Sequence, residues 1–197
     1  MEVFTPEDNI PALLGPRYVR ATYRWFVISK RAYTLIAVAR GNVVGLVAVT
    51  DTSFTTPLFR ASFLELLRSL AKKPLILFQK RLWQRLARGD KSSTRLRKRI
   101  VNDRRVAQLA VIIVKKEFRG QGIFPALIDA AKAISKGRGS RAIRAGVYKE
   151  NRQSRRAFEK VGWIEMPELE ANNLVFYVTY LDSEFAEEMR ASAGQFS

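Results

Sequence analysis

A short loop of the sequence holds two glycines at the point where a helix is about to begin. The residues RGQGIF occupy 119–124, after a β-branched run that ends at Val114 and before an apolar periodicity that suits a helix. The first N–H groups of a helix lack intrahelical partners and stand at the positive end of the helix dipole. Gly120 and Gly122 let the backbone approach a ligand closely. The loop therefore predicts an anion site, which suits a phosphate.

The residue types available to chemistry are restricted, because the chain contains no cysteine and no histidine. Disulfides, thiolate metal ligands, imidazole metal ligands and histidine general bases are thereby excluded. We expect no metal site. Proton transfer must use carboxylates, tyrosine, serine, backbone groups or water.

The loop is embedded in alternating strand and helix patterns. Two β-type runs separated by Arg40, Gly41 and Asn42 predict an antiparallel hairpin. Helical spacing predicts one or two helices within 11–31, and the acidic tail from Asp182 is expected to fray. The remaining patterns predict, in chain order, hairpin strands at 33–39 and 43–50, a strand from Val106, a helix at about 124–135, a strand at 141–148, a helix at 151–161 and a last strand at 172–181.

The positive charge is concentrated in the middle of the chain. The net charge is +17, and residues 60–105 hold 15 Lys or Arg residues against three acidic ones. Within this segment Leu75–Arg88 predicts a helix with an apolar face and a basic face, followed by a polar loop at 91–99. The helix either packs on the domain with its basic face in solvent or contacts an anionic membrane or substrate. Nucleic acid is disfavoured because aromatic residues are not interleaved with the charge.

Length and composition predict one domain over 1–197, since 47% hydrophobic residues suffice for a full core. The N-terminal stretch lacks a signal-peptide pattern and no apolar run reaches the roughly 20 residues of a membrane span. We expect a cytoplasmic protein, with peripheral membrane contact left open. An oligomer is also left open, because the apolar face of the basic helix could pack against a partner.

Two ordered patterns, RGQGIF at 119–124 and the residues Asn151, Ser154, Phe158, Gly162 and Trp163, resemble signatures of the GNAT superfamily of N-acetyltransferases. Its cofactor loop has the form Q/R-x-x-G-x-G/A and is matched by residues 119–124, with Val114 and Phe118 ahead of it. About thirty residues later the family has an Asn, a small residue, an aromatic residue and a Gly-aromatic pair. The chain supplies Asn151, Ser154, Phe158, Gly162 and Trp163 at those places.

The resemblance implies an α/β (α+β) fold with a GNAT-like mixed, mostly antiparallel central sheet flanked by helices. It covers a core of about 11–53 and 106–181. The segment 54–105 lies outside this core, as a long helical basic insertion between the third and fourth strands. The insertion is close to the acceptor end of the family's cleft, so its charge points to an anionic acceptor.

The family's cofactor is acetyl-coenzyme A (acetyl-CoA), used as a co-substrate. The resemblance implies that the loop N–H groups cradle its pyrophosphate with Arg119 nearby, and that Asn151 and Phe158 contact the rest of the molecule. The pantetheine arm would follow the main chain near Ile112 and Val114, and an N–H near Ile112 would stabilise the oxyanion. The predicted cofactor-binding residues are Ile112, Val114, Arg119, Gly120, Gln121, Gly122, Ile123, Phe124, Asn151 and Phe158.

Three departures from the family pattern affect the loop and the proton transfers. Phe124 stands where the loop has a glycine or alanine, so its ring must turn away from the phosphates, and Pro125 after it removes one donor. The strand from Val106 has no carboxylate, so Gln108 is the candidate to position a water. The family's tyrosine acid is replaced by Phe158, so Tyr148 is the candidate acid. Weaker alternatives are Asp51, Glu150 and Tyr177.

We therefore expect an N-acetyltransferase that moves an acetyl group from acetyl-CoA to a primary amine on a small molecule. The acceptor could be an anionic nucleotide-linked or lipid-linked amino sugar, or one presented at a membrane. Two alternatives remain open: an N-acyltransferase using long-chain acyl-CoA or an acyl carrier, and a non-enzymatic module that binds coenzyme A or docks on membranes.

Overall fold

A computed structural model describes residues 15–51, 54–72, 100, 103–169 and 173–194. The chain divides into two compact units. We call Met1–Lys30 with Phe54–Lys91 the helical unit, and Arg31–Ser53 with Ser92–Ser197 the sheet unit. The expectation of one domain over the whole chain stays a prediction.

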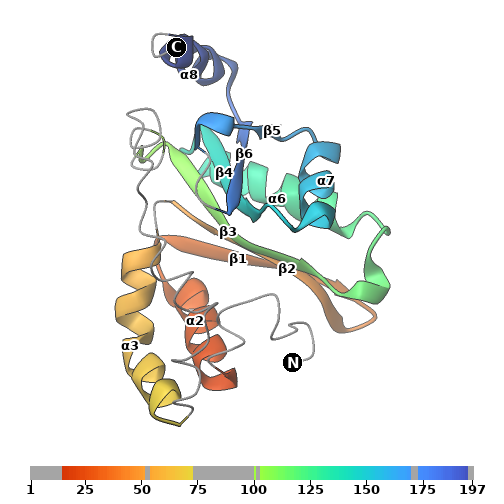
Figure 1. The fold of residues 1–197 in the computed structure, drawn as a ribbon. Helices are drawn as coiled ribbons and strands as arrows, with labels where there is room; N and C mark the ends of the chain where they lie inside the picture. Colours follow the sequence, from red (N-terminus) through yellow and green to blue (C-terminus); the bar gives the residue numbers. More distant parts are fainter. Residues whose placement is uncertain (1–14, 52–53, 73–99, 101–102, 170–172, 195–197) are drawn as a thin grey trace. The chain divides into compact units, whose positions relative to one another are not determined.

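The helical unit contains α2 (Pro16–Ile28) and α3 (Thr55–Lys72), which pack against each other (Figure 1). Pro16 lies in the first turn of α2, where its missing N–H costs no hydrogen bond. The ring of Phe26 packs edge-on against that of Phe54, with 5.4 Å between the centroids. One or two helices were predicted within 11–31, and the part of this stretch that the structure describes, from residue 15, contains one helix. The basic helix predicted over Leu75–Arg88 and the loop at 91–99 lie outside the described residues.

The sheet unit is built on one six-stranded sheet with the order β1-β2-β3-β4-β6-β5. Every neighbouring pair is antiparallel except β3 and β4. The predicted mixed, mostly antiparallel sheet flanked by helices is therefore confirmed. Its elements are β1 (Ala32–Ala39), β2 (Asn42–Thr50), β3 (Val106–Val114), η2 (Lys116–Phe118), α6 (Ile123–Gly137), β4 (Ala142–Tyr148), α7 (Arg152–Lys160), β5 (Ile164–Glu165), η3 (Pro167–Leu169), β6 (Leu174–Tyr180) and α8 (Ser183–Gly194).

The predicted hairpin is confirmed as β1 and β2, joined by the two residues Arg40 and Gly41. Both have positive φ, 51° and 74°, as the tight turns of two-residue hairpins require. The described residues ahead of the hairpin form α2 and no strand, so the insertion at 54–105 joins the second and third strands of this sheet. The family resemblance had placed this insertion between the third and fourth strands. Its beginning forms the helix α3.

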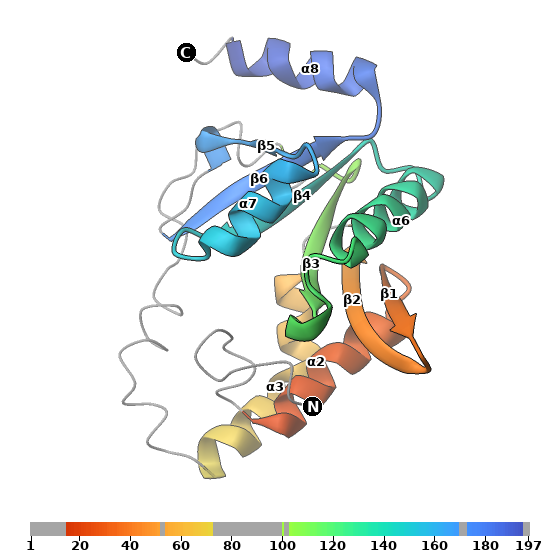
Figure 2. The ribbon, with the colours of Figure 1, turned by 90° about the vertical axis from the view of Figure 1, so that its right-hand side faces the viewer.

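Helices α6 and α7 cover one face of the sheet (Figure 2). Odd-numbered residues of β4 and β6 point to that face and pack with the apolar side of α6, whose Ile128 is fully buried. Gly45 on β2 permits close approach of α6, because a Cβ there would meet the side chains of Ile123 and Leu127 at 3.2 Å. The start of α6, and with it the glycine loop, is thereby held at the end of β3.

The other face of the sheet is covered in part by α8, which corrects the expectation that the acidic tail frays. Phe185 and Met189 of α8 are buried against Val106, Ala142 and neighbouring apolar residues. The tail is ordered because its apolar residues, four positions apart, form one helix face that the sheet can bury.

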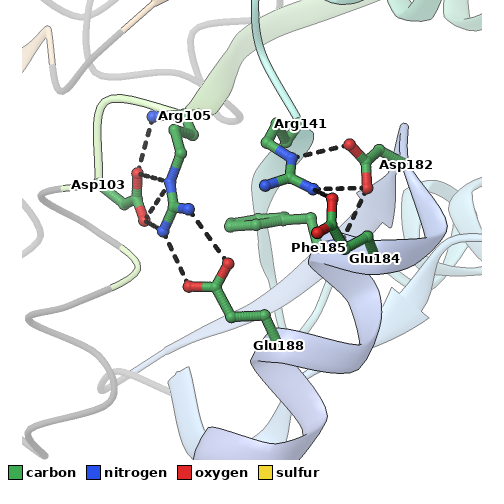
Figure 3. Close-up of polar contacts among 7 residues, drawn as sticks. All are labelled: Asp103, Arg105, Arg141, Asp182, Glu184, Phe185 and Glu188. Atoms are coloured by element: carbon green, nitrogen blue, oxygen red, sulfur yellow. Dashed lines mark hydrogen bonds and ion pairs between the residues drawn. The ribbon is translucent and has the colours of Figure 1, made fainter.

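Two arginines of the sheet unit bind the acidic residues of α8 (Figure 3). Arg105 pairs with Asp103 and Glu188, and Arg141 pairs with Asp182 and Glu184. Both guanidinium groups also lie over the Phe185 ring, at 4.7 and 5.2 Å from its centroid. The same acidity that predicted a solvated tail therefore attaches it to the sheet.

Candidate active site

The glycine loop leads from β3 through η2 into α6. Gly120 and Gly122 have φ values of 78° and 79°, a left-handed conformation that disfavours residues with a Cβ. Gly122 is the N-cap of α6 and has no side chain to satisfy the helix N–H groups. The sequence prediction of a tight glycine turn at a helix N-terminus is confirmed.

The backbone donors at the start of α6 are available to a ligand. Ala126 is the first residue whose N–H bonds within the helix, to Gly122 O at 3.1 Å, and Pro125 has no N–H. Among the described residues, the N–H groups of residues 121–124 have no hydrogen-bond acceptor. Four donors at the positive end of a 15-residue helix suit an anion such as a pyrophosphate.

Arg119 fixes the loop to its neighbours. Its Nε donates to the carbonyl of Val114 at 3.1 Å, and its Nη1 donates to Oε1 of Gln153 on α7 at 3.2 Å. The guanidinium group thus joins the end of β3 to α7 and adds positive charge beside the loop. Gln121 adds a second restraint, since its Nε2 donates to the carbonyl of Glu117.

Phe124 turns its ring into the core. The ring meets that of Phe158 edge-on, with 5.4 Å between centroids. Phe158 is only 2% exposed and also packs against Trp163 and Tyr177. The partly buried ring of Phe124 therefore packs against the hydrophobic core, as its replacement of a small residue required. Phe158 therefore exposes little surface to a ligand. Its predicted contact with a cofactor stays a prediction.

Asn151 caps helix α7. Its Oδ1 accepts a hydrogen bond from the N–H of Ser154 at 3.0 Å. The carbonyl of its side chain is therefore engaged, and the side-chain amide retains its NH₂ group for other contacts. The predicted contact of Asn151 with a cofactor would have to use that donor.

Strands β3 and β4 separate toward their carboxyl ends. Their parallel ladder runs from Val106↔Ala142 to Leu109↔Ala145, yet β3 continues to Val114 and β4 to Tyr148. Ala110 is the extra residue of a β-bulge, because Leu109 and Val111 pair with consecutive residues of β2. Beyond Leu109, β3 therefore pairs only with β2, and one edge of its backbone faces the gap beside β4. Ile112 and Val114 lie in this stretch.

β3 and β4 also bring two polar side chains into contact, on the face of the sheet that α8 covers in part. Gln108 pairs in register with Arg144 of β4, and its Oε1 accepts from Arg144 Nη2 at 2.9 Å. Arg144 is 4% exposed. Arg144 is not among the site residues predicted from the sequence, although an arginine inside the strand pattern RAIRAGVY is a recognisable signal.

The contact with Arg144 defines what Gln108 can offer to a ligand. Because its carbonyl oxygen accepts from the guanidinium group, the side-chain NH₂ group is the part that faces other partners. Tyr148 lies four residues after Arg144 on the same face of β4, half-buried at the carboxyl end of the strand. Four residues of strand span about 13 Å, so Gln108 and Tyr148 are not in contact.

The weaker candidates for proton transfer are engaged in structural contacts. Asp51 pairs with Arg138 at 2.6 Å, and Glu150 accepts from Asn173. The hydroxyl of Tyr177 lies 2.7 Å from Glu159 and 2.9 Å from Glu165, and burial raises the pKa of Tyr177 to about 12. These contacts disfavour all three as general acids or bases.

Within the described residues no group of three acidic side chains could hold a metal ion. None of the described helices is long and apolar enough to cross a bilayer.

The model of the acetyltransferase (GNAT) family matches residues 4–163. The chain belongs to this family. Three solved structures have a similar fold, each at low sequence identity. The GNAT domain of S. lividans PAT has a TM-score of 0.51 and 14% identity, and the match covers 80% of this chain and 66% of that one.

A streptothricin acetyltransferase from Bacillus anthracis, solved in complex with acetyl coenzyme A, has a TM-score of 0.50 and 14% identity over 81% of this GNAT chain and 68% of its own. A GNAT-family acetyltransferase from Staphylococcus aureus has a TM-score of 0.50 and 12% identity over 81% and 74%. No curated protein sequence matches the chain. At these identities the structures support the fold, and the family match supports the broad class of acetyltransferase.

Proposed function

We propose that this GNAT protein transfers an acetyl group from acetyl-CoA to a primary amine of a small molecule. The observation that carries the proposal is the glycine loop: four backbone donors at the N-terminus of α6 stand beside the splayed edge of β3. A pyrophosphate on the donors and a pantetheine arm along that edge would place a thioester in the gap between β3 and β4.

In the reaction the amine nitrogen attacks the thioester carbonyl, a C–N bond forms and the C–S bond breaks. The nitrogen loses a proton to water, and the departing thiolate gains one. We assign the positioning of that water to Gln108, which Arg144 orients through the 2.9 Å hydrogen bond. Tyr148 is the proposed donor to the thiolate, because it lies at the carboxyl end of β4 beside the gap.

The acceptor is proposed to be anionic or presented at a membrane surface, such as a nucleotide-linked or lipid-linked amino sugar. The support is charge: residues 60–105 hold 15 Lys or Arg residues against three acidic ones. We place the reaction in the cytoplasm, at or near the membrane, where the positive charge of residues 60–105 would attract an anionic acceptor or an anionic membrane surface. Exclusive turnover of small polyamines, which are cations at neutral pH, would contradict the assignment.

Calorimetric titration with coenzyme A and a thiol-release assay over a panel of amines test the function. We expect binding of coenzyme A and turnover of acetyl-CoA. Gln108→Ala and Tyr148→Phe should each lower kcat by about tenfold or more with little change in coenzyme A affinity. Tyr180→Phe, at the other end of the sheet, serves as the matched control.

The outcomes separate the alternatives. Tight coenzyme A binding without turnover of any amine would favour a non-enzymatic binding module, for which the carboxylate-free β3 is the supporting observation. Faster turnover of long acyl thioesters than of acetyl-CoA would favour the long-chain N-acyltransferase. Failure to bind coenzyme A would overturn the proposal.

A further inference from the structure

Helix α3 of the helical unit carries large apolar side chains on its exposed side. Phe59 is 45% exposed, Phe63 is 41% exposed and Leu67 is 48% exposed. At about 100° per residue these three fall within about 80° of one another, so they form a stripe along the helix. Leu64, 67% exposed, lies beside them. We call these four residues the α3 stripe.

The stripe is not the surface that joins α3 to α2. At about 100° per residue the Ser62 side chain lies about 100° from Phe63 and about 140° from Leu67; it is 1% exposed and donates its hydroxyl to the carbonyl of Leu58 at 2.7 Å. α2 supplies the buried residues Thr22 and Phe26, and the two helices run side by side in both ribbon views (Figures 1 and 2). The helix pair therefore buries side chains other than those of the stripe, and Phe26 of α2 packs on Phe54 just ahead of α3.

The helices that present the stripe are strongly basic. The described residues 15–30 and 54–72 contain seven Lys or Arg residues and one acidic residue, Glu65. That carboxylate pairs with Arg68 at 2.6 Å. On α2 the exposed Arg17, Arg20 and Arg24 stand at i, i+3 and i+7, which is one line along the helix.

An exposed stripe of Phe and Leu beside arginines has the composition of a helix that lies in the interface of an anionic bilayer. The apolar side chains enter the region between headgroups and acyl chains. Arginine stems extend along it while the guanidinium groups reach lipid phosphates. We propose that the α3 stripe docks on an anionic lipid surface, with the basic residues of α2 and α3 providing the charge attraction.

Vesicle co-sedimentation of the full chain tests the proposal, with phosphatidylcholine vesicles and with equimolar phosphatidylcholine and phosphatidylglycerol vesicles. We expect binding to the anionic vesicles that weakens as salt is raised. Phe63→Ser combined with Leu67→Ser should weaken the partition by about tenfold or more. Arg20→Gln combined with Arg24→Gln should weaken it and reduce the salt dependence.

The matched control is Ile36→Ser combined with Val38→Ser, which removes two apolar residues of β1 that are each 57% exposed. It should bind vesicles like the unmodified protein. Unchanged circular dichroism of each variant establishes that it is folded. The assay needs no turnover, so its result is distinct from that of the acetyl-transfer assay.

Absence of binding to anionic vesicles would overturn the proposal. So would binding that the Phe63 and Leu67 substitutions leave unchanged, since the charge elsewhere in the chain would then be sufficient. If those substitutions instead convert an oligomer into a monomer in gel filtration and no vesicle binding occurs, the stripe is an interface between copies of the chain.

Discussion

The side chain of Phe158 is buried in the sheet unit, with 2% of its surface exposed. The sequence placed it where the family has a tyrosine acid. In the structure its ring lies within about 6 Å of three other aromatic rings in the core. An aromatic residue without a hydroxyl suits this position, because a buried hydroxyl would need a partner.

Replacing Phe158 by alanine should leave a cavity among Phe124, Trp163 and Tyr177. We expect the free energy of unfolding to fall by about 3–5 kcal/mol, measured by urea denaturation. Phe59→Ala, at a 45% exposed site, should change it by less than about 1 kcal/mol. Equal effects of the two substitutions would mean that Phe158 is not a core residue.

At the scale of the element, the glycine loop depends on backbone conformation more than on space. A Cβ at Gly122 would meet no atom within 4 Å, yet the φ of 79° is unfavourable for any residue with a Cβ. The loop is thus a strained turn for alanine, although there is room for its methyl group.

Gly122→Ala should therefore lower the free energy of unfolding by about 1–2 kcal/mol, because the left-handed conformation must be kept for the N–H groups to converge. We expect the Kd for coenzyme A in calorimetric titration to rise by about tenfold if the loop instead relaxes. Gly137→Ala, near the end of α6 and with equal space, should change stability by less than about 1 kcal/mol and leave the Kd unchanged. If Gly122→Ala lowers the stability but leaves the Kd unchanged, the conformation of this turn contributes to folding and not to coenzyme A binding.

The attachment of α8 is an electrostatic contact that depends on pH. The Arg141 guanidinium group and the Phe185 N–H lower the pKa of Asp182 to about 2 from its ordinary value. A carboxylate with a lowered pKa stabilises the folded state above its unfolded pKa, and this stabilisation is lost as pH falls through the folded pKa. The contribution of Asp182 is therefore present at neutral pH and disappears between about pH 4 and pH 2.

Asp182→Asn should lower the free energy of unfolding at pH 7, and the difference from the unmodified protein should vanish toward pH 2. Urea denaturation at several pH values measures it. Glu187→Gln on the exposed side of α8 is the control and should show no such pH dependence. A difference that stays constant from pH 7 to pH 2 would contradict the role of the ionised carboxylate.

At the scale of the whole molecule, the chain passes between its two units more than once. The helical unit consists of two segments joined through the β1–β2 hairpin of the sheet unit. Neither unit is one continuous stretch of the chain. If one unit unfolded while the other stayed folded, the segments that connect them would be strained. This favours the prediction of one cooperative domain.

We therefore expect a single unfolding transition in urea. The sequence has three tryptophans: Trp25 and Trp83 fall within the helical unit, and Trp163 falls within the sheet unit. Each protein must therefore keep one tryptophan. Transitions followed in the Trp83→Phe/Trp163→Phe protein and in the Trp25→Phe/Trp83→Phe protein should each coincide with the circular dichroism transition. Two separated midpoints would show that the units unfold independently.

The sequence alone determined the features that depend on neighbouring residues. The hairpin, the glycine loop and the succession of strands and helices follow from local turn chemistry and periodicity, and the two signatures identified the family. These are short-range properties, so the residues that produce them are adjacent in the chain.

Only the tertiary structure decided which distant residues meet. The contact of Arg144 with Gln108 depends on strand register, and the splayed β3–β4 edge depends on where a ladder ends. The ordered tail depends on Arg105 and Arg141, which are far from α8 in sequence. Acidic residues are compatible with either a solvated tail or an ion-paired helix, and the choice is made by the charges that the fold brings beside them.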